Sequence, residues 1–205
     1  MTLPESMSDH WWWRPGVRPD RRLLVWHILL DDQPAVRDLV AAYQDRLAGI
    51  GGLDMIPAEW LHMTTQIVGF RDEIGGGEVD GMVESAQRRL AGLEPVTVEL
   101  GRLWIHSEAV VLGIRPPRAL DLVRDAVRAS AKRVRAHQLE AEPTWEPHVS
   151  VAYSNTAGPA APVVEALAER LEPVQMRVNE VHLVEQVRVD RLYRWERRAS
   201  ARLGP

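Results

Sequence analysis

Apolar positions along this chain recur at two spacings, which predict a mixture of strands and helices. A two-residue period is typical of strands, and a period of three to four residues is typical of helices. Strands are predicted at residues 22–30, a segment that is apolar on both faces as in a sheet centre, and at 60–70, 96–105, 109–114, 148–154, 174–189 and 191–203. The helical spacing predicts helices at residues 33–47, 79–91, 119–139 and 163–171. The order is β-α-β-α-β-β followed by α-β-α-β-β, which indicates an α+β fold with mixed sheets.

Several local signals refine these elements. Asp32 is predicted to cap the first helix, which ends before Gly49. The run Gly75-Gly76-Gly77 is predicted to be a flexible connector, because it lacks the spacing and strand–helix context of a phosphate-binding loop. A bend is expected near Asn179, and Met1 to Asp9 are expected to form a disordered lead.

Two short segments carry the candidate chemistry. His62-Met63-Thr64 follows Trp60, and His148-Val149-Ser150 follows Trp145; each lies in an apolar, strand-like run. On a strand, residues i and i+2 share a face, so each histidine lies beside a hydroxyl. Two such strands side by side would bring two imidazoles and two hydroxyls to one place. The alternative is a pair of half-buried strand histidines that precede hydroxyls by chance.

Such a group of side chains suits proton transfer at a phosphate. Two histidines with ordinary pKa values near 6.5 can hold opposite protonation states near neutral pH, so one can act as base and one as acid. The Thr64 and Ser150 hydroxyls can donate hydrogen bonds to phosphoryl oxygens. No His-x-x-x-His or Asp-x-Asp motif is present. We therefore expect neither a metal nor a cofactor.

The stretches Pro57–Thr64 and Glu146–Ala152 resemble the paired motifs of the 2H phosphoesterase superfamily. That superfamily includes bacterial 2′–5′ RNA ligase-like proteins and RNA 2′,3′-cyclic phosphodiesterases, and the resemblance runs from about Arg21 to the C-terminus. It implies a two-lobed α+β fold with antiparallel or mixed sheets around a central cleft, helices outside, and one motif strand from each lobe. It also implies opening of a 2′,3′-cyclic phosphodiester by His62, Thr64, His148 and Ser150, with a 2′-phosphate as product.

Two other functions stay open at this point. One is reversible 2′–5′ RNA ligation, which needs a groove for two RNA ends. The other is nucleotide binding without catalysis, which needs no matched acid and base. The chain also departs from the family pattern. Family members often carry a basic residue where this chain has Thr65-Gln66, and an Arg where it has Tyr153. Either Arg14, Arg191 or Arg194 replaces these charges, or the substrate differs from a terminal RNA phosphate.

The expected partner is a nucleotide or an RNA end with a cyclic phosphate. At least one aromatic side chain near the cleft is expected to stack on its base. The candidates for substrate contact are Trp12, Trp13, His27, Gln66, Tyr153 and Tyr193. His27 is alternatively a half-buried strand histidine. The Trp11-Trp12-Trp13 run is expected to pack over a core edge; base stacking or a membrane-surface anchor are the alternatives.

Composition narrows the class of protein. The 205 residues suit one domain, which we divide into an N-terminal arm, 1–20, and a single bilobal domain, 21–205. A net charge of −4 does not suit a protein that coats nucleic acid, and the basic helix 119–139 is interpreted as a solvated face rather than an RNA contact. There is no Cys, no apolar run long enough for a membrane span, and no apolar signal core. We expect a cytoplasmic monomer without a stable protein partner.

Overall fold

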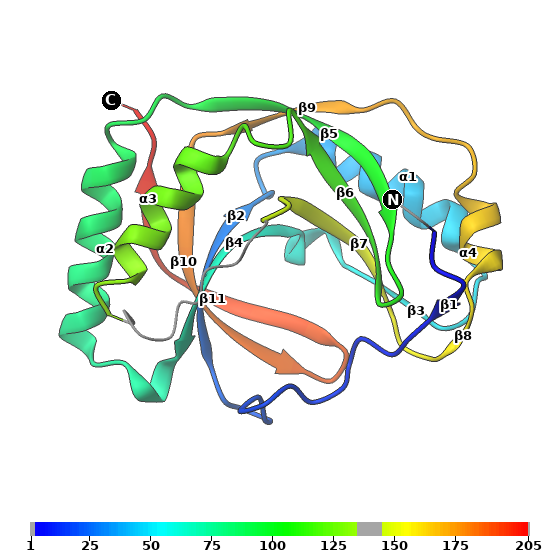
Figure 1. The fold of residues 1–205 in the computed structure, drawn as a ribbon, viewed down its shortest axis with the longest axis horizontal. Helices are drawn as coiled ribbons and strands as arrows, with labels where there is room; N and C mark the ends of the chain where they lie inside the picture. Colours follow the sequence, from blue (N-terminus) through cyan, green and yellow to red (C-terminus); the bar gives the residue numbers. More distant parts are fainter. Residues whose placement is uncertain (1–2, 135–144, 205) are drawn as a thin grey trace.

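Two antiparallel sheets and a two-stranded ribbon make up the β structure of the computed structural model, which describes residues 3–134 and 145–204 (Figure 1). The strands are β1 (Ser6–Met7), β2 (Leu23–Leu29), β3 (Leu53–Met55), β4 (His62–Phe70), β5 (Val96–Ile105), β6 (Ala109–Arg115), β7 (His148–Ser154), β8 (Gly158–Pro159), β9 (Val174–Val178), β10 (Glu180–Val189) and β11 (Leu192–Arg202). The helices are α1 (Pro34–Leu47), α2 (Gly76–Leu90), α3 (Asp121–Ala131) and α4 (Ala161–Ala166), with 3₁₀ turns at Ala58–Trp60 and Arg71–Glu73.

Each sheet takes strands from both halves of the chain. The four-stranded sheet has the order β11-β10-β2-β4, and the five-stranded sheet has the order β3-β7-β6-β5-β9. The two motif strands are therefore in different sheets: β4 is an edge of the first, and β7 lies inside the second. This arrangement confirms the predicted α+β class, and every strand pair among the described residues is antiparallel.

Helices α1 and α3 each pack against the sheet that does not contain the strand preceding them in the chain. Helix α1 follows β2 but packs on β7 and β9 of the five-stranded sheet, and α3 follows β6 but packs beside α2 and β4 of the four-stranded sheet. In Figure 1, α2 and α3 lie together on the left and α1 and α4 on the right. The apolar stripe of α1, which includes Val36, Val40 and Tyr43, is fully buried. These exchanges tie the two sheets together.

The predicted strand 174–189 is two strands that belong to different sheets. Strand β9 pairs with β5, whereas β10 pairs with β2 and β11. The change occurs at Asn179, where a bend was expected. The predicted helix 119–139 is too long: α3 begins at Asp121 and ends at Ala131, and residues 135–139 lie outside the described part of the chain.

Three local predictions were wrong. Gly76 and Gly77 belong to α2 rather than to a connector, because Glu78 accepts a hydrogen bond from the Gly75 N–H at 2.8 Å and so caps the helix. Asp32 does not cap α1; the capping position is Gln33, whose amide donates to the Arg177 carbonyl instead. The predicted disordered lead contains strand β1, which pairs with β8.

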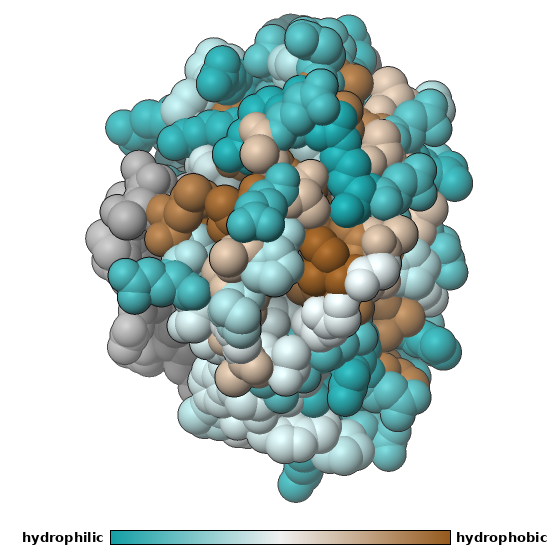
Figure 2. All heavy atoms as spheres, turned by 90° about the vertical axis from the view of Figure 1, so that its right-hand side faces the viewer, coloured by the Kyte–Doolittle hydropathy of each residue, from teal (hydrophilic) through white to brown (hydrophobic). Residues whose placement is uncertain are grey.

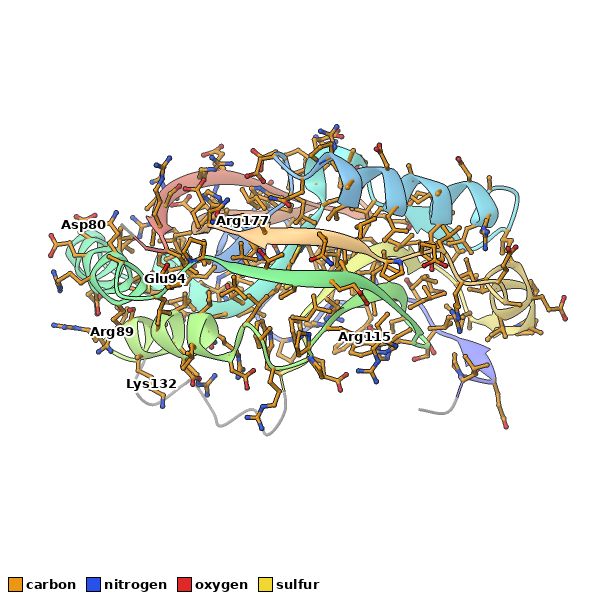
Figure 3. All side chains as sticks on the ribbon, turned by 90° about the horizontal axis from the view of Figure 1, so that it is seen from above. Asp80, Arg89, Glu94, Arg115, Lys132 and Arg177 are labelled. Carbon is orange, nitrogen blue, oxygen red and sulfur yellow. The ribbon has the colours of Figure 1, made fainter. Side chains whose placement is uncertain are left out.

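Charged side chains cover the outer surface. In the view from above, Asp80 and Arg89 of α2 and Lys132 at the end of α3 point away from the sheets (Figure 3). The basic helix is only partly a solvated face, since Arg118 pairs with Asp121 at 2.7 Å while Arg124 is buried. The side that carries α4 is mostly hydrophilic, with separate apolar patches (Figure 2). Among the described residues, no helix combines the length and apolar content needed to cross a membrane.

Candidate active site

His62 and His148 begin β4 and β7, and the local backbone sets both rings in the same way. The His62 Nδ1 lies 2.9 Å from the Trp60 carbonyl oxygen, and the His148 Nδ1 lies 2.8 Å from the Glu146 carbonyl oxygen. A carbonyl only accepts, so each Nδ1 carries a proton. The neutral form of each ring therefore has its lone pair on Nε2, the nitrogen directed away from its own backbone.

The two histidines differ in burial and in pKa. His62 is half-buried, and burial, with a further contribution from the His148 charge, lowers its pKa to about 4 although the bond to Trp60 opposes this. His148 is exposed, and its pKa is also lowered, first by partial removal from water and then by His106. His62 is thus the ring that stays neutral over the wider pH range.

The two motif strands contact each other across the sheets. Trp145, just before the second motif, donates its indole N–H to the Thr64 carbonyl oxygen at 3.2 Å. Thr64 is half-buried beside His62, and Ser150 is buried beside His148. The two motifs therefore lie on contacting strands where the sheets meet.

A β-bulge follows the hydroxyl residue in both motif strands. In β4, His27 pairs with Thr64 but Trp26 pairs with Gln66, so Thr65 is the extra residue; its hydroxyl donates to the Trp26 carbonyl at 2.7 Å. In β7, Val111 pairs with Ser150 but Val110 pairs with Ala152, so Val151 is the extra residue. A bulge shifts the alternation of side chains by one position. The next side chain on the cleft face is therefore three residues after the hydroxyl, at Ile67 and Tyr153.

Two aromatic side chains, buried His27 and half-buried Trp195, pack against His62. The His27 ring lies 4.3 Å from that of His62 between centroids, and its Nε2 is 2.9 Å from the Gln186 Oε1. Trp195 packs edge-on against His62 at 4.8 Å and also contacts His27. His27 is 1% exposed, and burial holds its pKa well below the ordinary value. It therefore lies under the catalytic candidate rather than at an open surface.

A cavity of about 290 Å³ opens beside these residues. The four-stranded sheet, Tyr153 of β7 and the N-terminal segment line it; the described lining residues are Trp12, Arg14, Val17, Arg21, Leu23, Val25, His27, His62, Thr64, Ile67, Phe70, Tyr153, Gln186, Arg188 and Tyr193. Neither His148 nor Ser150 is among them. Burial raises the pKa of Tyr153 to about 12, against a smaller opposite effect of the nearby Ser150 hydroxyl. Tyr153 is therefore a neutral hydroxyl that lines the cavity near Ser150.

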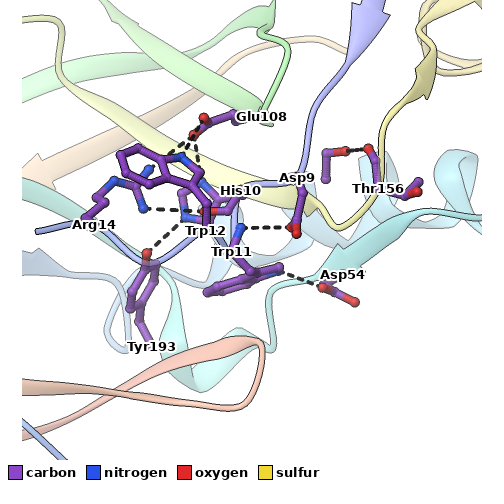
Figure 4. Close-up of polar contacts among 10 residues, drawn as sticks. Asp9, His10, Trp11, Trp12, Arg14, Asp54, Glu108, Thr156 and Tyr193 are labelled. Carbon is purple, nitrogen blue, oxygen red and sulfur yellow. Dashed lines mark hydrogen bonds and ion pairs between the residues drawn. The ribbon is translucent and has the colours of Figure 1, made fainter. Parts of the chain in front are cut away.

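Residues of the N-terminal segment line one part of this cavity. Figure 4 shows the polar contacts that hold the segment in place. Trp11 is buried and donates its indole N–H to Asp54 at 2.8 Å, while Trp12 is 49% exposed and donates to Glu108 at 3.1 Å. His10 stacks on Tyr153 with a centroid distance of 4.0 Å, and its Nε2 is 3.1 Å from the Tyr193 hydroxyl. Of the three tryptophans, Trp11 packs against the core, and Trp12 faces the cavity.

A second cavity of about 340 Å³ lies at the lead-in to the second motif. Trp104, Arg118, Arg124 and Trp145 are among its lining residues, but neither motif histidine is. The first cavity is the better candidate for the substrate site because it contains His62 and Thr64. Within the described residues, no three His, Asp or Glu side chains gather as a metal site would require.

Residues 31–190 match the family model described as the 2′-5′ RNA ligase superfamily. The chain belongs to this superfamily. Solved structures agree with it in fold. E. coli LigT in complex with 3′-AMP has a TM-score of 0.64 and 19% identity, over 89% of this chain and 98% of LigT. TT0787 of Thermus thermophilus has a TM-score of 0.66 and 17% identity, over 88% and 97% of the two chains. No curated protein matched the sequence.

In this member of the 2′-5′ RNA ligase superfamily, two of the residues predicted to contact the substrate do not line the cavity. Gln66 does not face the cavity, because the bulge at Thr65 turns it to the other face of β4, where it is buried and accepts a hydrogen bond from Arg128 at 3.0 Å. Trp13 is exposed but is not among the described lining residues. Trp12, Tyr153 and Tyr193 all line the cavity.

Arginine side chains from outside the motif strands also line the cavity. Arg14 lines it, as one of the proposed replacements would, whereas Arg191 is 3.9 Å from Asp54 and Arg194 is exposed elsewhere on the hairpin. Arg188 and Trp195 were missed in the sequence. Alternation along β10 and β11, which places Trp195 on the same face as Tyr193, is the signal that could have found them.

Proposed function

We propose that this protein is a metal-independent phosphodiesterase that opens 2′,3′-cyclic phosphates of nucleotides or RNA ends. The observation that carries the proposal is the matched pair of histidines. Each has its Nδ1–H bonded to the carbonyl two residues earlier, which leaves Nε2 for proton transfer at the junction of the sheets. A site that only binds nucleotides needs no such matched pair.

The directions of the two pKa shifts support one assignment of the roles. His62, with its pKa of about 4, is neutral and takes a proton from the attacking water. His148, which is more exposed, is the ring that carries a proton and gives it to the leaving ribose oxygen. The water oxygen forms a bond to phosphorus as the bond from phosphorus to the 3′ oxygen breaks, and the product is a 2′-phosphate. Thr64 and Ser150 donate hydrogen bonds to the phosphoryl oxygens.

The relatives supply further support for a nucleotide substrate. E. coli LigT has been solved with 3′-AMP, with NADP+, with ATP and with phosphate. In this chain the exposed indole of Trp12 and the Tyr193 ring line the same cavity as His62. Such aromatic surfaces stack on bases with little regard for sequence.

The decisive experiment is hydrolysis of a panel of nucleoside 2′,3′-cyclic phosphates and RNA with a cyclic phosphate end, in EDTA. Product analysis should show a 2′-phosphate. His62→Ala and His148→Ala should each lower kcat by about 10²- to 10⁴-fold, with unchanged circular dichroism. The matched control is His106→Gln, which removes an exposed histidine near His148 and should keep kcat within a few fold. Full activity in either alanine variant, or activity only with added metal, would refute the proposal.

A further inference from the structure

Three arginines line the cavity: Arg14, Arg21 and Arg188. The negative charge of a substrate with one phosphate would lie next to the motif histidines and hydroxyls. An arginine can bind a ligand only with N–H groups that are not already bonded to the protein. We therefore compare the carboxylates and carbonyls that contact each of the three.

Two of the three arginines are neutralised within the protein. Arg21 binds Asp72 through two nitrogens and Glu73 at 2.6 Å, and donates to the Gly16 carbonyl as well. Arg14 pairs with Glu108 at 3.2 Å, and its other terminal nitrogen reaches the His10 carbonyl. These guanidinium groups hold the N-terminal segment in place, and their charges are balanced.

Arg188 is different. Its Nε donates to the Asp190 carbonyl at 3.2 Å, and no described carboxylate lies within ion-pair distance of it. The guanidinium lies over two indoles, 4.1 Å from the ring centre of Trp13 and 5.2 Å from that of Trp11. Trp11 is itself fixed by Asp54. The stacked rings orient the planar group, while its terminal N–H groups stay available.

We propose that Arg188 binds a second phosphate of the substrate, on the 5′ side of the ribose that carries the cyclic phosphate. A planar guanidinium with free terminal N–H groups matches two phosphate oxygens at once. One cavity contains both Arg188 and the pair His62 and Thr64, so a single nucleotide can reach both. This inference rests on the proposed function and narrows its substrate class to nucleotides with a 5′-phosphoryl group.

The second phosphate could be a terminal 5′-phosphate or the phosphodiester that joins the last two nucleotides of an RNA. Both offer the same oxygens to Arg188. Three substrates with one base separate the cases: adenosine 2′,3′-cyclic phosphate, the same compound with a 5′-phosphate, and the dinucleotide ApA with a 2′,3′-cyclic phosphate end. The wild-type protein should favour either of the last two over the first by about 10- to 100-fold in kcat/KM, mainly through KM.

Arg188→Gln should remove this preference and leave kcat on adenosine 2′,3′-cyclic phosphate unchanged. Arg188→Lys, which keeps the charge but loses the fork, should retain part of it. The matched control is Arg194→Gln on the same hairpin; Arg194 is exposed and does not line the cavity, so the preference should persist. Equal kcat/KM on all three substrates, or a preference that survives both Arg188 substitutions, would overturn the inference.

Binding measurements separate this inference from the proposed function. Quenching of tryptophan emission reports binding, because Trp11 and Trp13 stack on Arg188. Adenosine 2′,5′-bisphosphate should bind the wild-type protein about 10- to 100-fold more tightly than adenosine 2′-monophosphate, and the Arg188→Gln variant should bind both alike. That result without hydrolysis of any cyclic phosphate would refute the proposed function and support the Arg188 site. Hydrolysis of cyclic phosphates with equal affinity for the two ligands would support the proposed function and refute the Arg188 site.

Discussion

The dependence of kcat/KM on pH tests the assignment of acid and base directly. Two histidines with ordinary pKa values would give a bell with its maximum near neutral pH, as the sequence predicts. In the structure, burial lowers the pKa of His62 to about 4 and also moves that of His148 below 6.5. The active form of the free protein has neutral His62 and charged His148. The bell should therefore rise through about pH 4 and fall below pH 6.5.

The same pKa shifts set the size of the decrease in kcat/KM at pH 7.5. With the pKa of His148 below 6.5, less than about one tenth of it is protonated at pH 7.5. The value of kcat/KM should then fall at least about tenfold between its maximum and pH 7.5. The profile of kcat should lie at higher pH than that of kcat/KM, because a bound anionic phosphate favours the charged form of both rings.

The assay is a stopped-time hydrolysis of adenosine 2′,3′-cyclic phosphate at constant ionic strength, with an NMR titration of the histidine Hε1 protons to identify each group. His106→Gln offers a directed perturbation: because the His106 charge lowers the pKa of His148, its removal should move only the basic limb, and upward. A maximum of kcat/KM above pH 7, or a His62 resonance that titrates near 6.5, would show that the reasoning from burial is wrong.

Three further outcomes are expected. Trp12→Ala should raise KM about 5- to 100-fold with little change in kcat, while Trp13→Ala, equally exposed but outside the cavity lining, should leave KM for a substrate with one phosphate unchanged. Tyr153→Phe should lower kcat about 2- to 10-fold with KM unchanged, because the Ser150 hydroxyl loses the neighbouring Tyr153 hydroxyl; an equal rate would show that Ser150 is oriented without it. The pKa of His10 is lowered to about 4, first by burial, so its contribution to stability is lost as pH falls from 6.5 toward 4. Urea unfolding at pH 5 and 7.5 should show a loss about 2 kcal/mol smaller in His10→Asn than in wild type.

Most long elements of the fold are predictable from their apolar residues, because each packs against the core along most of its length. The strands of both motifs and the apolar stripe of α1 are examples, with Val36 and Tyr43 fully buried as their spacing predicts. The short strands β1, β3 and β8 are not predictable in this way. They consist of two or three residues and depend on backbone pairing with distant segments. The change of sheet at Asn179 is likewise a matter of which strands pair, which periodicity does not encode.

The same limit applies to the candidate site. The four motif residues could be found because histidine and hydroxyl are two residues apart, a spacing that the strand converts into a shared face. The next residue on the same face could not be found in this way, because the residue inserted at the bulge shifts the alternation. At Thr65 the bulge is stabilised by a hydrogen bond to the Trp26 carbonyl, a residue 39 positions earlier in the chain. Counting by twos beyond Thr64 therefore leads to Gln66, which is buried beneath α3, instead of Ile67.

The bulges also explain why two similar motifs need not have the same role. Each strand carries a histidine, a hydroxyl residue and then a cavity-lining residue three positions after the hydroxyl, and these last residues differ. Ile67 is apolar and 51% exposed, so it offers a substrate surface but no hydrogen bond. Tyr153 is 9% exposed and lies near the Ser150 hydroxyl, and His10 of the N-terminal segment stacks on its ring. The environment of the second motif is thus completed by a segment that the first motif lacks. That asymmetry, together with the deeper burial of His62, gives a physical basis for one histidine to act as base and the other as acid.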